Sequence, residues 1–231
     1  MSGIFGMNIK MAIYGESHGK SIGVVLDGLP PGLALDEAAI AAEMARRAPG
    51  QNALSTARKE SDTVEIQSGF FNGFTTGTPL CARIVNSDQH SKDYSILADK
   101  MRPGHADYAG HVRYQGFNDY RGGGHFSGRL TAPLVFAGAV AKQALAQYGI
   151  VVGSHILQIN DIKEKRFDPM GVSDAELTAL HAKRFAVMDD AIGEKMQERI
   201  LQAKSELNSV GGVIEAIALH LPAGIGAPYF D

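Results

Sequence analysis

The chain has 231 residues, of which 45% are hydrophobic and 20% are charged, a composition typical of a globular protein with a buried core. Its 22 basic and 25 acidic residues give a formal net charge of −3, so a global positive field that would attract nucleic acid or an anionic membrane is excluded. No apolar run approaches the ~20 residues that span a bilayer, and the start of the chain lacks the pattern of a signal peptide. The single cysteine, Cys81, lies in an apolar run, and we expect a core thiol in a cytoplasmic protein.

The first fifty residues predict two strands and a helix. Short apolar runs at 9–14 and 22–27 flank a polar loop bounded by glycines, a pattern typical of strand, loop and strand. Asp36 precedes residues 37–47, where apolar residues recur at helical spacing, and we expect it to cap a helix there. Arg47, in the last turn, could simply favour the helix dipole or could bind an anion.

The next eighty residues predict a strand pair and one long irregular segment. Residues 51–62 form a polar stretch, and the runs 63–71 and 78–86 favour two paired strands joined by a turn. Residues 101–129 are rich in arginine, histidine and glycine and are too long for a hairpin. Loops of this length inside a compact domain are usually functional or disordered.

The rest of the chain predicts a helix at 130–149, strands at 150–160 and 211–222, and helices at 173–184 and 190–208. Together these elements favour an α+β class with mainly antiparallel sheets rather than a doubly wound parallel sheet, and we expect a single domain over residues 1–231. The sequence stops on a glycine- and proline-rich stretch directly after a strand, from which we expect a truncated C-terminus.

Three glycine-containing loops carry residues that could bind an anion. The first reads GESHG at residues 15–19, where neighbouring Ser17 and His18 would point to opposite faces of a strand, which argues against a Ser-His nucleophilic pair. A lone histidine in a loop is more often structural. Near a phosphate, however, His18 could protonate an anionic leaving group.

The second and third loops are RPGHAD at 102–107 and RGGGHFSGR at 121–129. The third leads into a predicted helix, where free backbone N–H groups and the helix dipole favour an anion. Ser127, Arg121 and Arg129 could bond phosphate or carboxylate. Neither a Walker loop nor a GxGxxG motif is present, and the histidines lack zinc-ligand spacing, so we expect a small ligand with several negative groups and no metal.

At these residues the sequence closely resembles the chorismate synthase family. The stretch GESHGKSIGVVLDGLPPG is similar to the family's N-terminal signature, and RPGHADY and DYRGGG..S.R.TA are similar to its two central motifs. TTGTPL, NSVGGVIEA and LPAGIGAPYFD follow in the family's order. The resemblance spans essentially the whole chain and implies a β-α-β-α layered sandwich that forms a homotetramer.

The resemblance implies conversion of 5-enolpyruvylshikimate 3-phosphate to chorismate and phosphate by 1,4-anti elimination, a step of aromatic amino acid biosynthesis. Reduced FMN is the implied cofactor: it lends electron density to the breaking C–O bond and its N5 then accepts the ring hydrogen, without net redox change. NADPH is implied as a possible source of the electrons that reduce the flavin.

The resemblance also implies roles for individual residues. His18 corresponds to the histidine that protonates the departing phosphate, and His105 to the one that manages the proton at flavin N1. The implied substrate-binding residues are Ser17, Arg47, Arg102 and Arg129. The implied FMN-binding residues are Arg47, His105, His125, Phe126, Ser127 and Gly128.

The sequence departs from the family pattern at three places. Many members read Arg-Ser-Ser-Ala-Arg where this chain reads His125 to Arg129, so Ser127 and Arg129 are the positions that match. An arginine usual in the family falls on Ala53, and Arg58 could replace it. A later signature with an Arg-Asp pair and further FMN contacts has no counterpart in these residues.

Two other readings of the sequence remain. The chain could be a non-catalytic fragment that binds anions, because the family's C-terminal portion is not represented. It could also bind RNA through RGGGHFSGR, which is similar to arginine- and glycine-rich RNA-binding tracts. The negative net charge of the chain, however, provides no positive electrostatic field to attract RNA.

Overall fold

The computed structural model describes residues 3–50, 54, 62–87 and 99–225. Its contacts divide the chain into two compact units, one formed by Met1–Gln51 with Ala57–Gln143 and the other by Asn52–Thr56 with Ala144–Asp231. The single domain expected over the whole chain stays a prediction.

The first unit is built on a five-stranded antiparallel sheet. Its strands, in spatial order, are β1 (Ile4–Phe5), β2 (Lys10–Gly15), β3 (Ser21–Asp27), β7 (Leu80–Val85) and β4 (Val64–Ser68). The strands predicted at 9–14 and 22–27 are confirmed as β2 and β3. The run 63–71 is divided, because Gly69 turns the chain with φ of 80° and a small hairpin of β5 (Phe70–Phe71) and β6 (Phe74–Thr75) follows.

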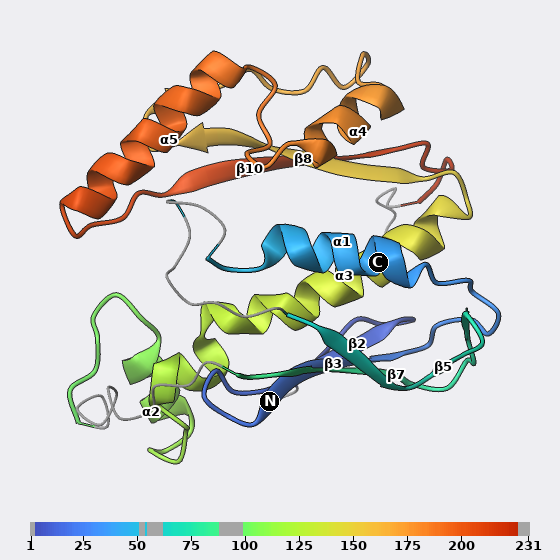
Figure 1. The fold of residues 1–231 in the computed structure, drawn as a ribbon, viewed down its shortest axis with the longest axis horizontal. Helices are drawn as coiled ribbons and strands as arrows, with labels where there is room; N and C mark the ends of the chain where they lie inside the picture. Colours follow the sequence, from blue (N-terminus) through green and yellow to red (C-terminus); the bar gives the residue numbers. More distant parts are fainter. Residues whose placement is uncertain (1–2, 51–53, 55–61, 88–98, 226–231) are drawn as a thin grey trace. The chain divides into compact units, whose positions relative to one another are not determined.

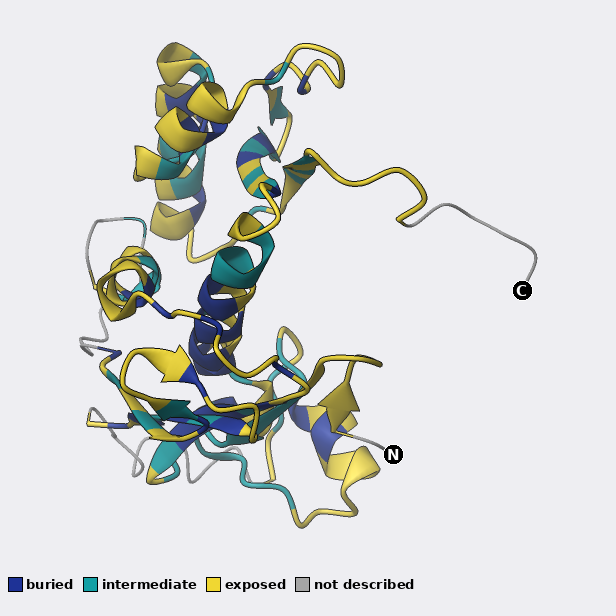
Figure 2. Cartoon of the chain, turned by 90° about the vertical axis from the view of Figure 1, so that its right-hand side faces the viewer, coloured by how far each residue is buried: buried dark blue, intermediate teal, exposed yellow. Residues whose placement is uncertain are grey.

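Helices α1 (Glu37–Arg47) and α3 (Thr131–Ala146) lie on the same face of this sheet (Figure 1). The predicted cap is confirmed, since the Asp36 carboxylate accepts hydrogen bonds from the N–H groups of Ala38 and Ala39 at 2.8 and 3.1 Å. Figure 2 shows the buried residues gathered between the sheet and α3. The core comes from alternate strand positions and from the inner helix faces: Ile22, Val24, Leu26, Leu80, Ile84, Ile40, Met44, Phe136 and Val140.

Cys81 was expected in this core but is only half-buried. Strand β7 buries Leu80, Ala82 and Ile84 toward the helices, so Cys81 falls on the opposite face of the sheet. There its Sγ lies 3.9 Å from the Tyr14 hydroxyl, and burial, together with that hydrogen bond, raises the pKa of Tyr14 to about 12.

The long segment 101–129 is more regular than its composition indicates. It contains the short helix α2 (Asp107–Arg113) and two 3₁₀ turns, η2 (Arg121–Phe126) and η3 (Gly128–Leu130). No side chain caps the start of α2, so the sequence carries no helix signal there. Tertiary packing supports it instead, because Gly110 lies so close to the Phe126 ring that a β-carbon would be 2.7 Å from it.

The second unit has a smaller antiparallel sheet in the order β10 (Gly212–Leu219), β8 (Val151–Ile159) and β9 (Ile162–Lys163), with helices α4 (Asp174–Ala182) and α5 (Asp190–Ser205). All of these except the two-residue β9 are predicted from the sequence. The fully buried His155 ring lies between two carboxylates, with Nδ1 2.6 Å from Glu164 and Nε2 3.1 Å from Glu215. Every strand pair in the described residues is antiparallel, and the α+β class is confirmed. Among those residues no helix is long and apolar enough to cross a membrane.

Candidate functional site

Three consecutive glycines bring two distant histidines to one place. Gly122, Gly123 and Gly124 have φ values of 57°, 83° and 54°, a left-handed conformation that favours glycine. A β-carbon on Gly122 would overlap the His18 ring, and one on Gly123 would overlap the His105 ring. The bare backbone of this turn therefore allows both imidazoles to pack against neighbouring residues.

The loop 15–19 joins β2 to β3 and is fastened to the same glycine segment. The Ser17 N–H donates to the Gly124 carbonyl at 3.0 Å, and His125 Nδ1 lies 2.8 Å from the Gly15 carbonyl oxygen. Ser17 and His18 are both buried, with 1% and 6% of their surface exposed. They do not point to opposite faces of a strand, because they lie in the loop, and both side chains approach Gly122.

Asp107 organises the second predicted loop. Its buried carboxylate accepts hydrogen bonds from the N–H, Nε and Nη2 of Arg102 at 3.1, 2.8 and 3.0 Å. These bonds lower the pKa of Asp107 to about 2, so it is ionised at neutral pH. His105 Nδ1 lies 2.8 Å from the same carboxylate. The aspartate thus holds Arg102 and His105, which are the two residues that the sequence singles out in this loop.

Arg121 forms a comparable fork with Asp119. Its Nε and Nη2 donate to the two carboxylate oxygens at 2.9 and 2.6 Å, and these hydrogen bonds lower the pKa of Asp119. Arg121 is thus held by a carboxylate in the same way as Arg102 is held by Asp107.

Arg47 and Arg129 meet at a buried carboxylate that the sequence pattern did not reveal. Arg47 Nη1 donates to Asp62 Oδ2 at 2.6 Å, and Arg129 Nη1 donates to Asp62 Oδ1. Arg129 Nε donates to Asn86 Oδ1 at 3.1 Å, and Arg47 Nη2 reaches the Gly128 carbonyl at 3.3 Å. Neither Asp62 nor Asn86 belongs to a glycine-rich motif, and both are recognised only from these contacts. Ala53 and Arg58, the positions considered for a further cationic contact, lie outside the described residues.

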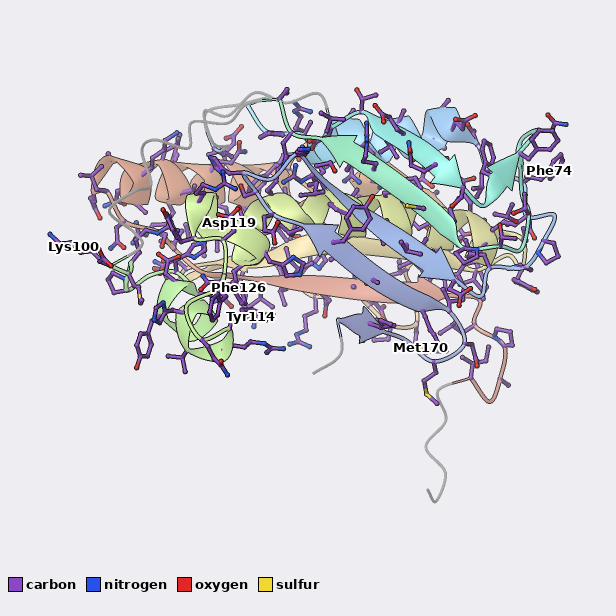
Figure 3. The ribbon with its side chains drawn as sticks, turned by 90° about the horizontal axis from the view of Figure 1, so that it is seen from below. Phe74, Lys100, Tyr114, Asp119, Phe126 and Met170 are labelled. Atoms are coloured by element: carbon purple, nitrogen blue, oxygen red, sulfur yellow. The ribbon has the colours of Figure 1, made fainter. Side chains whose placement is uncertain are left out.

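His125 and Phe126 line a cavity of about 420 Å³ beside the loop 15–19, together with Glu16, Tyr114, Phe117, Asn118 and Asp119. Figure 3 shows Tyr114 and Phe126 close together, with Asp119 near them; the two ring centroids are 6.1 Å apart. Ser127 follows Phe126 in the chain but is not among the lining residues, and its hydroxyl accepts from the Arg129 N–H at 3.3 Å. Aromatic walls with a few polar groups are typical of small-molecule sites.

A larger cavity, of about 510 Å³, lies in the second unit and is lined by Phe167, Val172 and Leu180 among others. It contains none of the predicted site residues. We place the candidate site in the first unit because histidines, arginines and buried aspartates converge there, and convergence of titratable groups is better evidence than volume. In the part of the chain that the structure describes, no three metal-ligating side chains form a group that could hold an ion.

The chorismate synthase family model matches residues 9–231. Similar proteins include the chorismate synthases of Cytophaga hutchinsonii, 42% identical over 100% of this chain and 63% of the relative, and of Sulfurimonas denitrificans, 46% identical over 98% of this chain and 61% of the relative. A solved crystal structure of chorismate synthase matches with a TM-score of 0.70 and 27% identity over 94% of this chain and 60% of that one. The expected fold class, that of chorismate synthase, is confirmed, and the chain spans about three fifths of the length of these relatives.

Proposed function

The chain belongs to the chorismate synthase family, and from that premise we propose that it converts 5-enolpyruvylshikimate 3-phosphate to chorismate and phosphate. The reaction would be a 1,4-anti elimination, which makes the protein a carbon-oxygen lyase of aromatic amino acid biosynthesis. The observation that carries the proposal is the packing of His18 and His105 against consecutive glycines. It supplies two proton-transfer groups within one small site, as an elimination with an anionic leaving group requires.

The proposed substrate-binding residues are Ser17, Arg47, Arg102 and Arg129. The substrate carries one phosphate and two carboxylates, and guanidinium groups bind such anions through paired hydrogen bonds. Arg102 keeps 38% of its side chain exposed, and Asp107 holds it in one orientation. Ser17 adds a hydroxyl beside His18, where it could donate a hydrogen bond to phosphate.

In the proposed mechanism His18 protonates the departing phosphate. Its ring is buried away from bulk water. Solvent therefore has little access to the proton that the ring gives to the leaving group. The proposed role of His105 is to transfer a proton to or from the bound cofactor. Its Nδ1 lies 2.8 Å from the Asp107 carboxylate, which orients the ring within the site.

Reduced FMN is the proposed cofactor; when bound it would supply electron density that helps the C–O bond to break and an acceptor for the ring hydrogen. The residues present fit a planar aromatic group, because Tyr114, Phe117 and Phe126 give aromatic walls to the cavity that His125 also lines. Arg47, His105, His125, Phe126, Ser127 and Gly128 are the proposed contacts. We propose NADPH as the source of the electrons that reduce the flavin. We also propose that the protein forms a homotetramer and is located in the cytoplasm.

The proposal is tested by incubating the 231-residue chain anaerobically with reduced FMN and 5-enolpyruvylshikimate 3-phosphate and measuring phosphate release. We expect turnover, and we expect His105→Ala to slow it without unfolding the protein, as judged by circular dichroism. Wild-type turnover in that variant would refute the role of His105. Phosphate binding without any turnover by the unmodified chain would favour the alternative that it is a non-catalytic anion-binding fragment, which its three-fifths coverage of the relatives keeps open.

A further inference from the structure

Asp62 combines a buried carboxylate with an unusual backbone conformation. Its side chain has 0% exposure, and its backbone φ of 51° lies in the left-handed region that residues other than glycine seldom adopt. A buried carboxylate is costly unless it is paired. Asp62 is paired twice, with Arg47 at the end of α1 and with Arg129 in η3, directly before α3. Two elements that are far apart in the sequence therefore meet at one carboxylate.

Asn86 continues this connection to the loop that carries His18. Its Oδ1 accepts from Arg129 Nε at 3.1 Å, while its Nδ2 donates to the carbonyls of Glu16 and Gly19 at 3.1 and 2.8 Å. The amide oxygen faces a donor and the amide nitrogen faces two acceptors, so only one orientation of this side chain satisfies all of its neighbours. The loop and Arg129 are thus fixed relative to each other.

We propose that Asp62 and Asn86 are positioning residues of the anion site, an inference that rests on the proposed function for its catalytic consequence. Asp62 holds Arg47 and Arg129 in one arrangement and cancels one of their two positive charges. Asn86 transmits the position of Arg129 to the loop of residues 15–19, and so to His18. Neither residue needs to touch the substrate for its loss to change turnover.

The loss of Asp62 should have opposite effects on the binding of inorganic phosphate and on the rate of turnover. Replacing it with asparagine leaves the two guanidinium groups without their shared carboxylate, so the local net charge rises from one to two and inorganic phosphate should bind more tightly. The same change frees the arginines from their fixed arrangement, and misplacement by about 1 Å can cost on the order of 10²-fold in rate. A purely structural residue would instead weaken binding and turnover together.

The experiment uses the 231-residue chain with Asp62→Asn and Asn86→Ala. Glu164→Gln is the matched control, since it also removes the charge of a buried, paired carboxylate but lies in the second unit. Three quantities are measured: hydrogen exchange at the Arg129 Nε–H by nuclear magnetic resonance, the dissociation constant of inorganic phosphate, and kcat and KM. Circular dichroism establishes that each variant is folded.

We expect both site variants to speed exchange at Arg129 Nε by about tenfold, because Asn86→Ala removes the acceptor of this N–H and Asp62→Asn weakens the hydrogen bond that holds the same guanidinium at Nη1. Asp62→Asn should tighten phosphate binding and lower kcat on the order of 10²-fold, and Asn86→Ala should lower kcat with little change in KM. Unchanged exchange in both variants, or equal effects in Glu164→Gln, overturns the proposal. If Asp62→Asn does not fold, Asn86→Ala decides it. If the unmodified chain has no turnover, the proposed function fails, and exchange and phosphate binding still decide the positioning roles.

Discussion

Replacing Gly123 with alanine should displace His105. Gly123 has φ of 83°, and a β-carbon built there overlaps the imidazole. Holding alanine in the left-handed region costs about 1–2 kcal/mol of folding free energy. The overlap adds a second effect, because either His105 or the glycine turn must move. Displacement of a proton-transfer group by about 1 Å is expected to lower kcat on the order of 10²-fold.

Gly73 offers a matched control for the backbone cost. It has nearly the same φ, 84°, but nothing lies within 4 Å of a β-carbon built on it. Gly73→Ala should therefore lower the free energy of unfolding by the same ~1–2 kcal/mol without changing kcat. Urea denaturation gives both free energies, and the phosphate-release assay gives both rates. If Gly123→Ala loses no more activity than Gly73→Ala, the packing of His105 against the glycine turn does not govern the reaction.

Three further changes test other parts of the structure. Arg102→Lys keeps the positive charge but loses the forked contact with Asp107. Steady-state kinetics should show KM raised by about tenfold, since a hydrogen bond to a charged group contributes roughly 1.5 kcal/mol or more. An unchanged KM would mean that Arg102 does not bind the substrate. Arg102 lowers the pKa of Asp107 from 3.8 to about 2, so the stabilisation from Asp107 is present above about pH 4 and is lost as the pH falls toward 2. Asp107→Asn should therefore make the urea midpoint less dependent on pH across that range. An unaltered pH dependence would contradict the lowered pKa of Asp107. Glu164→Ala leaves the buried His155 with one of its two carboxylates, and urea denaturation should show about 3–5 kcal/mol of lost stability; a loss below about 1 kcal/mol would mean that the pair is not held as described.

The parts of the fold that the sequence predicts are those with a local cause. Asp36 is followed by helical apolar spacing, so the bounds of α1 follow from capping and periodicity alone. Strands β2, β3 and β7 coincide with short apolar runs bounded by polar or glycine-rich residues, which is a local signal. By contrast α2 depends on the fit between Gly110 and Phe126, a contact that becomes visible only when residues 101–129 are folded.

The candidate site divides in the same way. His18, His105 and Ser127 stand in glycine-rich motifs whose composition indicates close approach of the backbone to a ligand. Asp62 and Asn86 have ordinary neighbours in the sequence, and what distinguishes them is tertiary contact with Arg129. The fork of Arg121 on Asp119 joins residues only two apart, yet the glycine-rich pattern did not indicate it.

The most direct test of the account is the stoichiometry of a single anaerobic reaction of this chain with reduced FMN and 5-enolpyruvylshikimate 3-phosphate. Chorismate, phosphate and the oxidation state of the flavin are measured in the same sample. The proposed elimination predicts equal amounts of chorismate and phosphate, with the flavin still reduced when the reaction ends. Phosphate formed without chorismate, or one flavin oxidised for each phosphate released, would contradict the proposed elimination.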